Sequence, residues 1–283
     1  MKPSTDLEQP AADATYTPYV PPPSEPPARE ITDLALGAPF VWLKLGWQDL
    51  MASKAIALFY GVCFWVMALV LGAVFRNRPE YAMSIASGCL LVGPFLAMGL
   101  YEVSRRREQG LNPVLSASLT CWDKHLPSMG LLVMVLIVLE LLWGRASLVV
   151  FAVFFNTGMP STTGVLQALL DPQNREFLAV YLLVGGLFAT LVFGVSAVSI
   201  PMILDRDTDA ISAALTSLQV IFLNAAVMFL WAMMITGLVV LALLNGAWAL
   251  LVVGPWLGHA SWHAYRGSVR WLDANSVTLT PTT

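Results

Sequence analysis

Charged residues are scarce in this chain of 283 residues, where Asp, Glu, Lys and Arg together make up only 12% of the sequence. An ordinary soluble domain carries about 25% charged residues. So little charge cannot solvate a surface, and the 57% hydrophobic residues and mean hydropathy of +0.70 indicate that lipid surrounds most of the chain. The net charge of −3 lacks the basic excess of a nucleic-acid-binding protein, so we expect no nucleic-acid partner.

Cysteines are also few, and the familiar catalytic motifs are missing. Cys63, Cys89 and Cys121 lie far apart in the sequence, so they predict neither a disulfide framework nor a cysteine metal site. The sequence has no phosphate-binding glycine loop, no His-Glu-x-x-His and no Gly-x-Ser-x-Gly. It therefore carries no strong signature of catalysis.

The N-terminal region differs from the rest of the chain, because eight of the 18 prolines lie within the first 30 residues. Its apolar content is too low to offset the entropy of ordering, which predicts a disordered tail. The basic start and apolar run of a secretory signal peptide are absent. We expect a proline-rich cytoplasmic tail over 1–33, a transmembrane domain over 34–271 and a short cytoplasmic tail over 272–283.

Six apolar segments are long enough to be transmembrane helices, which need about 20 apolar residues to cross the hydrocarbon layer. The six segments are Ala55–Phe75, Tyr81–Val103, Pro127–Trp143, Leu178–Leu204, Ala225–Leu244 and Ala247–Tyr265. A helix running on from the third segment would be too long, so we expect Leu148–Phe155 to lie at the far membrane interface. The sequence thus predicts an all-α membrane protein with six transmembrane helices.

The distribution of basic residues predicts the orientation in the membrane. With the N-terminus in the cytoplasm, ten cationic residues near the membrane fall inside and four outside. The inner ones are Arg29, Lys44, Lys54, Arg105, Arg106, Arg107, Lys124, Arg206, Arg266 and Arg270, and the outer ones are Arg76, Arg78, Arg145 and Arg175. Both termini are therefore expected in the cytoplasm.

The six segments group into three similar helix pairs, each preceded by an amphipathic stretch suited to the membrane interface. Pro113–Thr120 and Asp209–Thr216 share four identical positions, and a weaker match begins at Pro39. The second helix of each pair carries one proline expected to kink it: Pro94, Pro201 and Pro255. Two of these helices also carry small residues four apart that suit close helix packing: Gly93 and Ala97, and Gly254 and Gly258.

Polar residues recur four and eight positions after the three prolines. These positions hold Met98 and Glu102, Asp205 and Asp209, and His259 and His263. Residues four apart share a helix face, so Glu102, Asp205, Asp209, His259 and His263 can converge, and carboxylates with imidazoles suit a divalent metal such as iron, zinc or manganese. The alternative is that these residues cap helices and pair with Arg105–Arg107 and Arg266 where the helices leave the membrane.

Two further features have a structural and a functional interpretation. The run Arg105, Arg106 and Arg107 can set the topology and contact anionic lipid head groups. Glu140 is the most deeply placed acid of the third segment, with Arg145 nearby. A pair reaching toward the membrane surface and a proton relay both remain possible for this glutamate.

Three segments resemble a family of bacterial integral membrane proteins catalogued as a domain of unknown function. They are Gly93-Pro-Phe-Leu-Ala-Met-Gly-Leu-Tyr-Glu102 with Ser104-Arg105-Arg106 just beyond it, Pro201-Met-Ile-Leu-Asp-Arg206, and Gly258-His-Ala-Ser-Trp-His-Ala-Tyr-Arg266. The resemblance covers roughly Gly37 to Trp271. It implies a location in a bacterial inner membrane, and it implies no activity, cofactor or catalytic residue.

These observations predict a non-enzymatic inner-membrane protein that acts as a scaffold or by interaction with lipid, a larger membrane complex or further copies of itself. One alternative is a transporter of a small solute or metal ion, which the proline-containing helices and the polar residues favour. Another is a metal-binding redox accessory protein that uses the histidine pair. A divalent metal is the one cofactor that the sequence suggests.

Overall fold

The computed structural model describes residues 29–77, 82–155 and 174–272, which are helical almost throughout. The helices are α1 (Ala38–Ala52), α2 (Lys54–Asn77), α3 (Ala82–Glu108), α4 (Leu115–Thr120), α5 (Leu126–Phe154), α7 (Arg175–Ser196), α8 (Ser199–Arg206), α9 (Ala210–Leu223), α10 (Ala225–Leu244) and α11 (Leu250–Ser268), with a 3₁₀ turn η2 (Asp123–His125) before α5. Two short strands, β1 (Arg29–Ile31) and β2 (Val269–Trp271), pair with each other. Most of the two predicted tails lies outside the described residues, and β1 is formed by residues from the end of the first one.

Four helical stretches in the described part of the chain are long and apolar enough to cross a membrane. They are Lys54–Asn77, Leu115–Phe154, Arg175–Arg206 and Ala225–Leu244, and Ala210–Leu223 is a shorter apolar helix. Large apolar side chains on these helices stay exposed, as lipid-facing helices require. The all-α membrane class is therefore confirmed, whereas the grouping of six transmembrane helices into three similar pairs stays a prediction.

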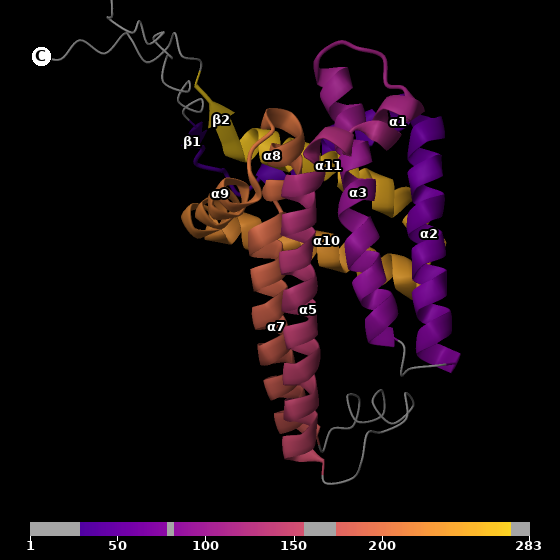
Figure 1. Ribbon diagram of the computed structural model, residues 1–283, viewed down its shortest axis with the longest axis vertical. Coiled ribbons are helices and arrows are strands. Elements are labelled where there is room, and N and C mark those ends of the chain that lie inside the picture. Colours follow the sequence, from indigo (N-terminus) through magenta and orange to yellow (C-terminus); the bar gives the residue numbers. More distant parts are fainter. Residues whose placement is uncertain (1–28, 78–81, 156–173, 273–283) are drawn as a thin grey trace, which may run out of the picture. The chain divides into compact units, whose positions relative to one another are not determined.

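Helix α11 packs against α1, α2 and α3, while α2 and α3 run side by side, as do α5 and α7 (Figure 1). The closest approaches between these helices occur at glycines, which have no side chain. A Cβ atom on Gly61 of α2 would lie 2.1 Å from the carbonyl oxygen of Leu251 in α11, and one on Gly46 of α1 would lie 2.6 Å from the backbone nitrogen of Ala260. Proline at position 255 cannot donate to that Leu251 carbonyl, so α2 approaches α11 where the helix ladder is interrupted.

The predicted helix Leu178–Leu204 is interrupted between α7 and α8. Pro201 has no N–H to donate to the carbonyl of Ala197, four residues earlier, and the ladder breaks there. The amide of Val198 instead donates to the hydroxyl of Ser217 in α9 at 3.1 Å, in a buried position. The helix is thus interrupted one turn before Pro201, where α9 supplies the partner of the Val198 amide. Pro94 and Pro255, by contrast, lie inside α3 and α11.

The expectation that the third segment ends near Trp143 is wrong, because α5 continues without a break to Phe154. Its 29 residues span about 43 Å at 1.5 Å per residue, more than the hydrocarbon layer. Nothing between Trp143 and Leu148 stops the helix: Gly144 is buried, and the hydroxyl of Ser147 donates back to the Gly144 carbonyl at 2.8 Å. The helix therefore extends beyond the length that the hydrocarbon layer requires.

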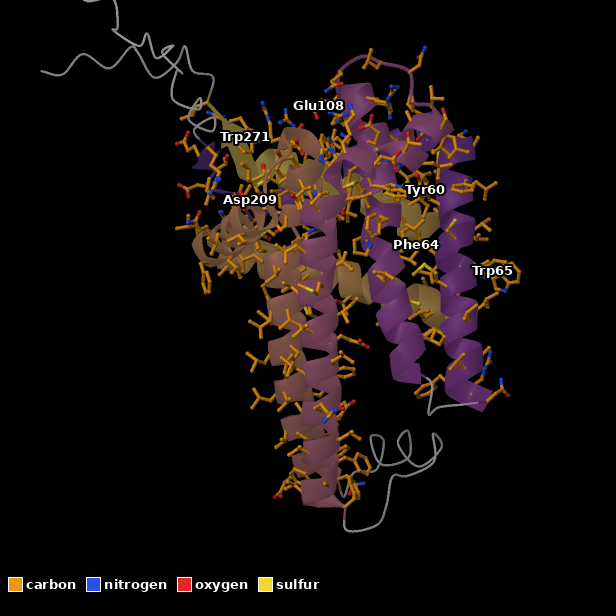
Figure 2. All side chains as sticks on the ribbon, viewed as in Figure 1. Tyr60, Phe64, Trp65, Glu108, Asp209 and Trp271 are labelled. Atoms are coloured by element: carbon orange, nitrogen blue, oxygen red, sulfur yellow. The ribbon has the colours of Figure 1, made fainter. Side chains whose placement is uncertain are left out.

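The turn between α10 and α11 lies beside the middle of α2. Trp248 in this turn contacts Trp65, with ring centroids 4.5 Å apart, and Trp65 lies about midway along the 24 residues of α2 (Figure 2). Gly246 and Ala247 make the turn with φ of 72° and 67°, a left-handed conformation that glycine adopts without strain. The α10–α11 hairpin therefore reaches only part of the way along α2.

Candidate functional site

Charged side chains gather at the last turns of α3, α8 and α11, where α3 and α11 also contact α1. Each of these three helices carries arginine in its last turn, where a positive charge is favourable at the negative end of the helix dipole. Glu108, at the end of α3, marks this region in Figure 2. We define the polar cluster as Asp49, Glu102, Ser104, Arg105, Arg106, Arg107, Glu108, Asp205, His259, His263 and Arg266.

Asp49 joins three helices within the polar cluster. This residue of α1 is 7% exposed, and its two side-chain oxygens accept from different helices. Arg107 of α3 donates to Oδ1 at 2.7 Å, and Nε2 of His263 in α11 lies 2.8 Å from Oδ2. Arg107 also donates to the backbone carbonyl of Gln48 at 2.9 Å. A single carboxylate thus fixes α1 against both α3 and α11.

Opposing effects act on the Asp49 carboxyl group. Burial raises its pKa, whereas the hydrogen bonds from His263 and Ser104 and the nearby imidazoles lower it. The balance places the pKa of Asp49 below its ordinary value of 3.8. Asp49 is therefore ionised at neutral pH, and the stability that this charge contributes is lost only as the pH falls below that value.

His259 of α11 is fully buried, and its Nδ1 atom lies 2.8 Å from the hydroxyl oxygen of Ser104. Which of the two atoms donates in this hydrogen bond depends on the tautomer of the imidazole. The other ring nitrogen, Nε2, is buried, and the described residues supply no hydrogen-bond partner for it.

The other carboxylates of the polar cluster also have partners. Glu102 is 5% exposed and accepts from Arg105 at 2.8 Å and from Arg106 at 3.1 Å, both on its own helix. Burial of its charge is therefore offset by two charge-assisted hydrogen bonds. The arginine run, expected to contact lipid head groups, thus makes part of its contacts inside the protein, and head-group contact by these arginines stays a prediction.

Two further contacts tie α11 to α3 and α8. Glu108 accepts from Arg266 at 2.8 Å and from the indole N–H of Trp262 at 3.0 Å, both of which lie on α11. The hydroxyl of Tyr265 donates to Asp205 of α8 at 2.7 Å. The polar cluster therefore joins α1, α3, α8 and α11 by side chains of opposite charge or complementary hydrogen bonding.

The five residues predicted to converge have separate partners. Glu102 pairs with arginines, Asp205 with Tyr265, His259 with Ser104 and His263 with Asp49. Asp209 lies at the start of α9, where it accepts from the Ser212 amide at 2.9 Å and caps the helix. That backbone hydrogen bond lowers the pKa of Asp209. The described residues include no group of three His, Cys, Asp or Glu side chains able to hold a metal ion, so metal binding stays a prediction.

The predicted packing residues behave differently in the two helices. A Cβ atom on Gly254 would lie 2.8 Å from Phe64 of α2, and one on Gly258 would lie 2.4 Å from Leu100 of α3. Both glycines of α11 therefore lie at close helix contacts. Gly93 of α3 has nothing within 4 Å of such an atom, and Ala97 is partly buried. Close packing of α3 occurs instead at Gly99, where a Cβ atom would lie 2.0 Å from the Tyr60 hydroxyl.

Asp49, Ser104 and Glu108 were not expected in the cluster from the sequence. Asp49 lies in the weakest copy of the repeated amphipathic stretch, where an acid on a short helix is ordinarily exposed. One signal was present, because Asp49 aligns with Asp123 in that repeat. The partners of Asp49 are 58 and 214 residues away in the sequence, at Arg107 and His263, so no local spacing connects them.

Comparison with known proteins bears on the middle of the chain. No match was found among curated proteins or among solved structures. Residues 82–205 match the model of a family described as "Predicted integral membrane protein (DUF2189)", and this range includes Gly93–Glu102 and Pro201–Asp205 but not Gly258–Arg266. The resemblance drawn from the sequence is thus confirmed over residues 82–205, where the chain is similar to a predicted integral membrane protein family of unknown function.

Proposed function

We propose that this integral membrane protein is non-enzymatic and acts by binding a partner protein in the membrane, as a scaffold within a larger complex or with further copies of itself. The observation that supports this most is how the ionisable side chains are used. In the described part of the chain, the carboxylates of the polar cluster each contact a basic or hydroxyl side chain. The contacts of Asp49, Asp205 and Glu108 hold α1, α3, α8 and α11 together. The polar cluster therefore has the properties of a structural clamp.

Helix α9 offers the surface for such a partner. Its 14 residues span about 21 Å, too short to cross the membrane. Four large apolar residues on it are well exposed: Ile211 at 64%, Leu215 at 54%, Phe222 at 79% and Leu223 at 67%. An exposed apolar face of this kind requires either lipid or another protein to cover it. The partner that we propose is an apolar helix of a membrane protein.

Photo-crosslinking from α9 tests this role. A photoreactive amino acid in place of Phe222 is expected to give a protein adduct of one defined mass in native membranes. The same probe at Leu183, which is 75% exposed on α7, is expected to give lipid adducts only. An adduct with twice the mass of this chain would identify a homo-oligomer as the partner. If position 222 yields only lipid adducts, the proposed partner surface is wrong.

We further propose a bacterial inner-membrane location with both termini in the cytoplasm. The arginines in the last turns of α3, α8 and α11 support this orientation through the positive-inside rule. Six crossings were expected from the sequence. The turn between α10 and α11 lies beside the middle of α2, because Trp65 and Ala68 of α2 pack on Ala247 and Leu250. This position favours a partial rather than a full crossing by the last two helices. We propose that α10 and α11 enter the membrane and return from the cytoplasmic side.

Cysteine labelling distinguishes the partial crossing from six full crossings. In a variant without Cys63, Cys89 and Cys121, a single cysteine at Asn245 is expected to resist a membrane-impermeant thiol reagent applied from outside the cell. A single cysteine at Asn77, at the far end of α2, serves as the control and should react. Rapid outside labelling at position 245 would instead establish a full crossing by α10 and α11.

A transporter of a small solute or metal ion remains a second candidate, favoured by the interrupted helix at α7 and α8 and by the buried Nε2 atom of His259, which has no hydrogen-bond partner among the described residues. Uptake by the purified protein in liposomes, lost on His259→Ala, would support it. Metal analysis of the same preparation tests the divalent-metal and redox hypothesis.

A further inference from the structure

A groove of about 440 Å³ lies between α7 and α10, and none of its lining residues belongs to the polar cluster. Helix α7 packs on α5 and α9, whereas α10 packs chiefly on α11, so the space between α7 and α10 is left open. Both helices belong to stretches that are long and apolar enough to cross a membrane. Membrane hydrocarbon is therefore the medium from which an occupant of this groove would come.

The lining of the groove selects an uncharged, apolar occupant. Among the described residues that line it, none is charged, and the hydroxyl groups are those of Thr190 and Thr236. The Thr190 hydroxyl already donates to the carbonyl of Gly186 in its own helix at 2.8 Å. Met228 and Met233 also line the groove, and the flexible thioether side chain adapts to an occupant that is itself flexible.

The length of the groove matches one leaflet of a bilayer. On α10 the lining runs from Ala225 to Thr236, a distance of about 16 Å at 1.5 Å per residue. Half of the hydrocarbon layer is about 15 Å, the depth over which one acyl chain of a lipid extends. The volume lies within the range of about 300–1,000 Å³ for small-molecule sites. Length, volume and lining thus agree on a single apolar chain.

We propose that this groove holds one acyl chain of a membrane phospholipid. The chain would lie between α7 and α10, and the head group would lie at the end beside α9, where Ala225 begins α10 and Ile221 of α9 joins the lining. This lipid site goes beyond the proposed partner protein. It depends neither on that partner nor on the polar cluster.

Glycine at position 186 keeps the groove open and provides the test. A Cβ atom on Gly186 would meet nothing within 4 Å, so the side chain of Gly186→Leu can enter the groove without striking the protein. Gly237 of α10 is the matched control. A Cβ atom there would also meet nothing within 4 Å, but Gly237 does not line the groove. Both substitutions add the same side chain to an exposed position of an apolar helix.

Binding of radiolabelled dioleoylphosphatidylcholine to the purified full-length protein in dodecyl maltoside tests the proposal. This lipid has no net charge, so attraction to the arginines of the polar cluster contributes little. The parent protein is expected to bind it saturably, with one lipid per chain. Gly186→Leu should weaken binding at least ten-fold, whereas Gly237→Leu should bind as the parent protein does. Elution of each variant as a single detergent-solubilised species verifies the fold before binding is measured.

Competition on the parent protein gives a second test that needs no substitution. Oleoyl lysophosphatidylcholine, which has one acyl chain, should displace the labelled lipid. Glycerophosphocholine, which has the same head group and no chain, should not. Equal affinity of Gly186→Leu and the parent protein for the lipid would overturn the proposal. Binding that does not saturate, or displacement by glycerophosphocholine, would overturn it as well.

Discussion

Gly61→Ala is expected to destabilise the protein by about 3 kcal/mol, at the upper end of what overpacking costs in a well-packed core. The added methyl carbon would lie 2.1 Å from the carbonyl oxygen and 2.8 Å from the carbonyl carbon of Leu251. These are backbone atoms of α11, so they cannot move aside as a flexible side chain would. Relief requires α2 and α11 to separate. Reversible unfolding in mixed detergent micelles measures the change.

The same helix supplies the control for Gly61. Gly72 also lies in α2, but a Cβ atom there would meet nothing within 4 Å. Gly72→Ala should therefore be neutral or slightly stabilising, because alanine is the better helix former. If Gly61→Ala and Gly72→Ala have the same free energy of unfolding, then α2 and α11 do not pack as described.

Asp49→Asn is expected to cost about 2 kcal/mol. Breaking a fully buried ion pair by removing one partner costs about 3–5 kcal/mol, and partial exposure of the Arg107 partner reduces that cost. The side chain of Arg107 is 30% exposed, against 10% for that of Asp49. The substitution leaves Arg107 and His263 without the carboxylate that compensates them. Unfolding in mixed micelles at neutral pH measures the loss.

Asp207→Asn is the matched control. Asp207 pairs with His125 at 2.9 Å, but the Asp207 side chain is 78% exposed, where ion pairs contribute little. Its φ of 51° is also compatible with asparagine. The pH dependence is a second check. Because folding lowers the pKa of Asp49, its charge stabilises the protein above pH 3.8, and this stabilisation is lost as the pH falls below that value. The difference in the free energy of unfolding between the parent protein and Asp49→Asn should therefore shrink as the pH falls below 3.8.

Many of the helices could be predicted because a helix that crosses lipid needs about 20 largely apolar residues. The predicted Ala225–Leu244 coincides with α10, and the expected amphipathic stretches appear as α1, α4 and α9. Helix ends were less predictable. Phe154 ends α5 well past the expected position, since only a cap or a proline stops a helix. The depth of the α10–α11 hairpin depends on tertiary contacts such as Trp65 with Trp248, which no local pattern encodes.

The candidate site was predicted only in part. Counting from the prolines identified His259 and His263 as members of one helix face, and both lie in the polar cluster. The spacing could not supply their partners, because Asp49 and Ser104 come from helices distant in sequence. Asp209 followed the same spacing but caps α9, since a short break separates α8 from α9 and changes the direction of the chain. Periodicity holds only within one continuous helix.

A double-mutant cycle between Asp49 and His263 tests most directly whether the polar cluster is a clamp. The cycle compares the free energies of unfolding of the parent, Asp49→Asn, His263→Gln and the double variant. A clamp predicts that each single variant is destabilised and that the pair is coupled by about 1 kcal/mol or more. Residues that serve an active or transport site are often held at a cost in stability. Neutral or stabilising single substitutions with additive effects would therefore contradict the clamp and favour a working site.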